Sequence, residues 1–173
     1  TEIYTLSLHD ALPICAVLFQ DARLKYLAQG VLLEDNLWNL SWEEKTFYDG
    51  LAPRKPDRAS AALTDSGNYF LKNGFDRTSD YLRFHCGCMG SGHGHGDQLH
   101  VDYYSHGEDI LVDAGRYTYV DNEIRRRLKA PSSHNTVCID GENFCTCVDS
   151  WGYSRMALPW KGEHNFLPGM GIK

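Results

Sequence analysis

The chain has 173 residues, of which 42% are hydrophobic and 23% are charged, and its formal net charge is -6. This length suffices for one moderate hydrophobic core or for pieces of two, and it excludes a large multidomain enzyme. The acidic balance excludes general attraction to nucleic acid or to an anionic membrane, because those partners favour concentrated lysine and arginine.

The first fourteen residues resemble the translation of a sequencing-adapter oligonucleotide. Thr1–Ile14 lacks the basic start of a secretory signal peptide, and Asp10 and Pro13 interrupt its apolar stretch. We therefore expect residues 1-14 to be non-native, the natural reading frame to begin near Cys15, and the chain to be a fragment of a longer protein.

Residues 15-52 have the spacing of amphipathic helices. Apolar residues recur there at the three- and four-residue steps of one helix face: Leu24, Leu27, Ala28, Leu32 and Leu33. Ser41 and Glu44 match a capping box, which predicts that a second short helix begins there. Residues 53-58 contain two prolines and clustered charge, so we expect a linker.

Residues 59-173 consist of short alternating runs separated by turn residues. This pattern is typical of an antiparallel sheet, and the predicted fold class is mainly β, part of a β-sandwich preceded by short helices. The predicted strands are Asn68–Leu71, Tyr81–Cys86, Leu99–Ser105, Ile110–Val112 and Thr136–Ile139. The predicted turns are Asn73-Gly74, Ser105-His106-Gly107 and Asp140-Gly141.

The glycine-rich segment 90-97 contains two histidines, His93 and His95. Side chains alternate along an extended strand, so both imidazoles would project from one face, with His100 and Asp102 on the opposite face. Two imidazoles on one face can present a metal ligand beside a base.

Two later segments carry further candidate ligands. Asp113 ends an apolar run, and His134 stands directly before a predicted strand. Together with a histidine of the glycine-rich segment they offer the ligand types that Zn²⁺ accepts, with a fourth position for water or another ligand. The alternative interpretation is that the histidines are solvated and that Asp113 accepts backbone hydrogen bonds in a turn.

Taken in order, these motifs resemble the heparinase II/III family of polysaccharide lyases, over about residues 59-151. The residues that carry the resemblance are Gly92-His93-Gly94-His95-Gly96-Asp97, Leu111 to Tyr117, Ser133 to Val137 and Asp140-Gly141. The resemblance implies that residues 59-173 are an incomplete heparinase II/III-like β-sheet domain, and that residues 15-52 are the last helices of an α/α-toroid domain.

The resemblance also implies roles for single residues. It makes His93 a catalytic histidine that faces the substrate, and it makes His95, Asp113 and His134 the ligands of a structural zinc ion. It places the tyrosine acid/base, and the residues that neutralise the substrate carboxylate, upstream of this chain. The fragment is therefore expected to be inactive alone.

The activity that the resemblance implies is β-elimination on a uronic-acid-containing acidic polysaccharide, such as a glycosaminoglycan or alginate. The reaction needs a base for the C5 proton, an acid for the departing 4-oxygen and neutralisation of the carboxylate charge. The implied parent is bacterial in type and periplasmic, cell-envelope-bound or secreted. No nucleic-acid partner and no membrane insertion are expected.

The densest basic run is Arg125, Arg126 and Arg127, with Lys129 nearby. One interpretation is a solvated charged loop. The other is that the three arginines bind a sulfated or carboxylated sugar chain through bidentate guanidinium contacts. They are candidate substrate-binding residues.

Two other classes of protein stay open on the sequence alone. One is a non-catalytic carbohydrate-binding or structural β-sandwich with a structural metal. The other is a metal-dependent hydrolase or cupin-like enzyme in which the ion activates water or oxygen. A lyase releases an unsaturated uronide, whereas a hydrolase leaves saturated ends. The sequence specifies neither the polysaccharide nor the oligomeric state.

Overall fold

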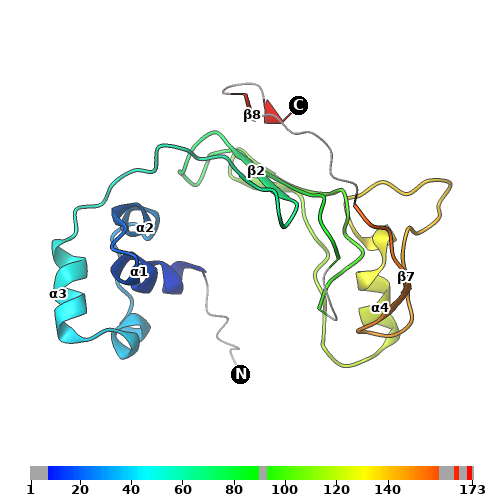
Figure 1. The fold of residues 1–173 in the computed structure, drawn as a ribbon, viewed down its shortest axis with the longest axis horizontal. Helices are drawn as coiled ribbons and strands as arrows, with labels where there is room; N and C mark the ends of the chain where they lie inside the picture. The colour runs from blue at the N-terminus through cyan, green and yellow to red at the C-terminus, as the bar shows by residue number, and fades with distance from the viewer. Residues whose placement is uncertain (1–7, 90–92, 160–165, 168–170, 173) are drawn as a thin grey trace. The chain divides into compact units, whose positions relative to one another are not determined.

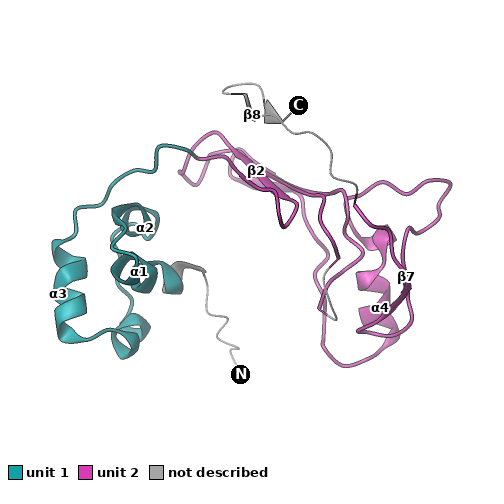
Figure 2. Cartoon of the chain, viewed as in Figure 1, with its two compact units in different colours: residues 1–58 teal, residues 59–173 magenta. Residues whose placement is uncertain are grey.

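The computed structural model describes residues 8-89, 93-159, 166-167 and 171-172 (Figure 1). The chain divides into two compact units, residues 1-58 and residues 59-173 (Figure 2). Residues 1-7 of the adapter-like segment, and Gly90 to Gly92 of the glycine-rich segment, lie outside the described residues. In the part of the chain that the structure describes, no helix is long and apolar enough to cross a bilayer.

The first unit consists of short helices. They are α1 (Leu8–Leu18), α2 (Ala22–Leu27), the 3-10 helix η1 (Glu34–Asn39) and α3 (Trp42–Gly50). The predicted capping box is confirmed at the start of α3, where Ser41 Oγ accepts from the Glu44 N–H at 3.2 Å and the Glu44 carboxylate accepts from the Ser41 N–H at 2.7 Å. Helix α1 includes residues 8-14, which the sequence had assigned to the adapter-like segment.

A small core closes this unit. Ala16 and Val17 of α1 pack with Tyr48 of α3, and partly buried leucines surround them. The buried Lys25 of α2 donates from Nζ to the carbonyl oxygens of Tyr48 at 2.5 Å and Asp49 at 3.1 Å. Because each backbone carbonyl at a helix end needs a donor, this lysine satisfies two of them and fixes α2 to the end of α3.

The second unit is built on a five-stranded antiparallel sheet whose strands follow the chain order. Four of the five predicted strands are confirmed to within two residues, as β2, β3, β4 and β5. The strands are β1 (Ala61–Leu63), β2 (Asn68–Lys72), β3 (Tyr81–His85), β4 (His100–Ser105) and β5 (Glu108–Leu111).

The predicted turns are also present. His106 and Gly107 both have positive φ, 53° and 88°, as the tight turn of the β4–β5 hairpin requires. Between β2 and β3, the Asn73 side chain donates to the Asp80 carboxylate at 2.8 Å and accepts from the Asp80 N–H at 2.9 Å. Side-chain hydrogen bonds of this kind explain why asparagine signals a turn.

The predicted strand Thr136–Ile139 is wrong. Apart from one isolated bridge between Ile139 and Glu142, these residues form no ladder in the described chain. The reason is that Asn135, the residue before this segment, makes the hydrogen bonds to β4 in place of a ladder. Its backbone carbonyl accepts from the Val101 N–H at 3.1 Å, and its side-chain amide donates to the Val101 carbonyl at 3.1 Å.

Beyond the sheet the chain forms α4 (Glu123–Lys129), the 3-10 helix η2 (Pro131–Ser133) and two short hairpins. The hairpins pair β6 (Thr146–Cys147) with β7 (Tyr153–Arg155), and β8 (Phe166–Leu167) with β9 (Gly171–Ile172). Helix α4 lies next to β7 (Figure 1), where Lys129 Nζ is 4.6 Å from the centre of the Tyr153 ring. The basic run therefore forms a helix, and the loop interpretation is wrong.

Replacing Gly67 with alanine is expected to destabilise the second unit by at least about 3 kcal/mol. Gly67 has φ +66°, and an added Cβ would lie 2.4 Å from the backbone carbonyl oxygen of Cys86, beside β3. Gly141, with φ +74° and open space around it, is the matched control, and Gly141→Ala should cost only about 1 kcal/mol. Urea unfolding measures both losses, and equal values would contradict this packing.

Candidate functional site

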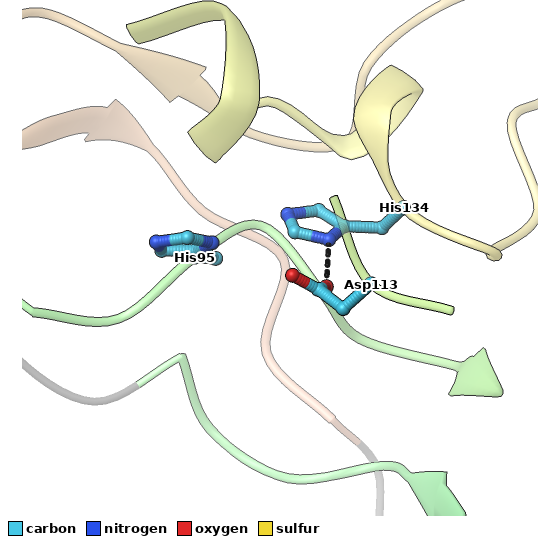
Figure 3. Close-up of side chains that lie close together, drawn as sticks. All are labelled: His95, Asp113 and His134. Atoms are coloured by element: carbon cyan, nitrogen blue, oxygen red, sulfur yellow. Dashed lines mark hydrogen bonds and ion pairs between the residues drawn. The ribbon is translucent and has the colours of Figure 1, made fainter. Parts of the chain in front are cut away.

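Three predicted ligands meet in the second unit. His95, Asp113 and His134 each offer one ligand atom, and these atoms all lie within 4.8 Å of one another (Figure 3). His95 lies in the connection before β4, Asp113 follows β5, and His134 follows η2. The fold thus brings together three segments that are far apart in the sequence.

His134 is set up as a metal ligand by its own hydrogen bond. Its side chain is fully buried, and its Nδ1 donates to Asp113 Oδ2 at 2.7 Å. A carboxylate only accepts, so the proton of a neutral His134 lies on Nδ1 and the lone pair on Nε2. That Nε2 is buried and has no partner among the described residues. A buried, unpaired lone pair on imidazole is what a metal ion would satisfy.

The other two ligands are in the protonation state that binds metal. Burial, and then the nearby charge of Arg125, lower the pKa of His95 to about 4. For Asp113, burial raises the pKa, but hydrogen bonds from His134 and the Gly115 N–H outweigh it and bring the pKa down to about 2. At neutral pH the site therefore holds a neutral imidazole and an ionised carboxylate, as zinc binding requires.

Arg125 contacts one of the three candidate ligands directly. It is fully buried, and its Nη1 donates to His95 Nε2 at 2.8 Å. Within the described residues its Nε and Nη2 have no partner. Arg125 thus faces the candidate ligands, while Arg126 and Arg127 of the same helix are exposed to solvent. Substrate binding by these arginines stays a prediction.

The sequence missed a role for His100. This fully buried side chain accepts from the Asn135 N–H at Nδ1, 3.1 Å, so Nε2 carries the proton and donates to Asp102 Oδ1 at 2.8 Å. Nε2 also lies 3.8 Å from Asp113 Oδ2. The spacing of His100 and Asp102 along one strand indicated that they share a face, which is confirmed by their hydrogen bond.

The prediction that His100 and Asp102 lie on the face opposite His93 and His95 is wrong, because it required residues 93-102 to be one continuous strand. The strand begins only at His100, and Leu99 before it has φ +62°. This change of backbone direction removes the alternation, and the ring of His100 ends up 5.6 Å from that of His134.

His93 is separate from the candidate ligands. It is exposed, and its ring lies edge-on to those of Tyr119 and Trp151, with 5.3 Å between centroids in each case. The ring of His95 instead faces that of His134, also at 5.3 Å. The two histidines therefore have the separate surroundings that a catalytic group and a metal ligand would need.

Lowering the pH from 6.5 to 4 is expected to destabilise the metal-free protein through His95. Burial lowers its pKa from the ordinary 6.5 to about 4. The unfolded state therefore binds more protons in this range, and the free energy of unfolding falls as the pH falls. His95→Gln removes this proton uptake, so its stability should depend less on pH in urea titrations with a chelator present.

The control for that experiment is His106→Gln, at the exposed turn between β4 and β5. It should change the dependence of stability on pH less than His95→Gln does, because burial is what lowers the pKa of His95 and the side chain of His106 is exposed. An unchanged dependence in His95→Gln would show that His95 is not held neutral in the folded protein.

Comparisons with known proteins give the family. The family model "Heparinase II/III-like, C-terminal" matches residues 55–166. A search of curated proteins found no match. Among solved structures, one titled a heparinase III gene product with methylated lysines has a TM-score of 0.62 at 23% identity, covering 80% of this chain and 19% of that one.

Heparan sulfate lyase HepC from Pedobacter heparinus has a TM-score of 0.51 at 21% identity, covering 72% of this chain and 20% of that one. A further structure titled heparinase III has a TM-score of 0.58 at 21% identity, covering 77% of this chain and 20% of that one. These likenesses show the fold, and the chain spans about a fifth of the length of these structures. Because the family model covers well over half of it, the chain belongs to the heparinase II/III-like family, as part of the C-terminal β-domain.

Proposed function

We propose that this chain is part of a polysaccharide lyase that cleaves uronic-acid-containing acidic polysaccharide by β-elimination. The observation that carries the proposal is the family match over residues 55–166, which includes both the exposed His93 and the group of His95, Asp113 and His134. The solved structures titled heparinase and heparan sulfate lyase support the same class of enzyme. The parent would act in the periplasm, at the cell envelope or outside the cell.

The three ligands fit zinc. The unpaired, buried Nε2 of His134 and the ionised Asp113 form a two-histidine, one-carboxylate set with the neutral imidazole of His95, whose Nε2 would exchange its hydrogen bond from Arg125 for the metal. When bound, zinc would supply a structural cross-link between the three segments. Those segments adjoin β4, β5 and η2, so the ion would also steady the loop that carries His93.

His93 is the group proposed to meet the substrate. An exposed imidazole can hydrogen-bond to the sugar and can act as a general acid or base. The edge contacts with Tyr119 and Trp151 fix the orientation of its ring. The remaining requirements of the elimination, a tyrosine acid/base and a neutralised substrate carboxylate, are assigned to the toroid part of the parent, so this chain is proposed to be inactive alone.

Zinc binding is expected to depend on His134. Titrating Zn²⁺ into metal-free protein in a calorimeter should show one tight site, and His134→Ala should weaken it by at least about 100-fold, because it removes a ligand and leaves Asp113 without its partner. His106→Ala, which removes an exposed histidine from the same unit, should bind as the wild type does. Equal affinity in His134→Ala would overturn the site.

The lyase is tested on the full-length parent. Incubation with uronate polymers should release a 4,5-unsaturated uronide, detected by its ultraviolet absorbance. His93→Ala should lower kcat by about 100- to 10,000-fold, as expected for loss of an acid–base group, while His106→Ala should keep wild-type activity. Products with only saturated ends would exclude the lyase, and binding without any cleavage would favour the non-catalytic carbohydrate-binding module.

A further inference from the structure

Next to His93, two aromatic rings from different segments lie parallel to each other. The ring centroids of Tyr119 and Trp151 are 5.9 Å apart, and their planes differ by 7°. Although each ring also contacts His93, Tyr119 is 42% exposed and Trp151 is 41% exposed. Large rings normally lose most of their exposure when they serve a core. This pair therefore offers apolar surface to a ligand.

A cation completes the cluster. The guanidinium carbon of Arg116 lies 3.5 Å from the centre of the Tyr119 ring, which is a close cation–π contact. The Arg116 side chain is exposed, and no carboxylate pairs with it in the described part of the chain. Its planar fork of N–H donors is available for an anion, held in place by the ring beneath it.

The cluster is built on a fixed backbone. Asp121 Oδ1 accepts from the N–H of Ser150 at 3.1 Å and from its hydroxyl at 2.6 Å, which joins the segment of Tyr119 to the turn that carries Trp151. Ser150 is fully buried, and its carbonyl accepts from Lys129 Nζ at 2.8 Å. The two rings are thus positioned before any ligand arrives, which lowers the entropy cost of binding.

The turn itself is closed by one carboxylate. Asp149 Oδ1 accepts from the N–H groups of Trp151 at 2.7 Å and Gly152 at 2.6 Å. Because Ser150 is buried and the turn is closed by these hydrogen bonds, the backbone of Trp151 is held in place and only its side-chain torsions stay free. An exposed ring held in this way is typical of a binding surface and not of a loop that moves freely.

We propose that Arg116, Tyr119 and Trp151 form a binding subsite for an acidic pyranose beside His93, here called the aromatic subsite. A pyranose has an apolar C–H face that packs on an aromatic ring, and its carboxylate or sulfate group is a bidentate partner for guanidinium. The inference rests on the proposed function, because it names the sugar class that the same site would hold. In this proposal, His93 would act on the substrate and the three residues of the aromatic subsite would determine which sugar is bound.

The test measures binding without cleavage. Saturated oligosaccharides of equal length, one unsulfated oligouronate, one sulfated glycosaminoglycan and one neutral glucan, are titrated into the 173-residue chain by calorimetry. Trp151→Ala should weaken binding of the acidic sugars by about tenfold. If the neutral glucan binds, its binding should be weakened by a similar factor. Arg116→Gln should weaken only the acidic sugars, by about tenfold, and comparison of the two acidic probes identifies carboxylate or sulfate as the recognised group.

Two controls keep the result interpretable. Trp42→Ala removes another exposed tryptophan with a cation over its ring, Lys45 at 5.5 Å, from the first unit, and it should bind as the wild type does. Trp151→Phe keeps a ring, so it should retain most of the affinity and shows that any loss in Trp151→Ala is not misfolding. Wild-type affinity in both Trp151→Ala and Arg116→Gln, or no binding of acidic sugar by the wild type, would overturn the subsite.

The outcome is separable from that of the lyase proposal. Loss of binding in these variants, with no unsaturated product from the parent, would keep the aromatic subsite and remove the lyase. Unsaturated product from the parent, with unchanged binding in the variants, would keep the lyase and remove the subsite.

Discussion

The second unit depends on the hydrogen bond between His134 Nδ1 and Asp113 Oδ2, at 2.7 Å. It connects the segment after η2 to the segment after β5, and it lowers the pKa of the carboxyl group against the effect of burial. Because it fixes the imidazole proton on Nδ1, it also turns the Nε2 lone pair into the buried interior. This one hydrogen bond therefore joins the two chain segments and leaves an unpaired lone pair on Nε2, which makes the region suitable for a metal ion.

Much of the local structure could be predicted from the sequence because it is decided locally. Alternating side chains identified four strands of the sheet, and the capping box at Ser41 identified the start of α3. The turn residues at positions 106 and 107 identified the β4–β5 hairpin, since positive φ at both is required there. The three candidate ligands were also named from the sequence, but only through the order of the motifs, because their spacing contains no information about their convergence.

The remaining features depend on tertiary contacts that no local pattern encodes. Periodicity over residues 93-102 could not show that the backbone changes direction at Leu99, which places His100 against the ring of His134. A run of three arginines reads as a solvated surface, yet the helix that contains it buries Arg125 completely and points it at His95. Burial of a charge is costly, so the position of Arg125 depends on its surroundings in the fold, including the hydrogen bond to His95, and not on the composition of the run.

The interior of the second unit is unusually polar, and this has a consequence for its stability. Among the described residues of this unit, the buried set is dominated by side chains that carry nitrogen or oxygen, such as His100, Arg125 and Lys129. Hydrogen bonds between such groups contribute little net free energy, and a group left unpaired costs more than a made bond returns. Two nitrogens of Arg125 and one of His134 have no hydrogen-bond partner among the residues that the structure describes. A ligand that satisfies even one of them would stabilise the folded state by mass action. The stability of this unit and the candidate metal centre are therefore linked through His134, because its unpaired Nε2 destabilises the metal-free protein and is also the lone pair that a metal ion would bind.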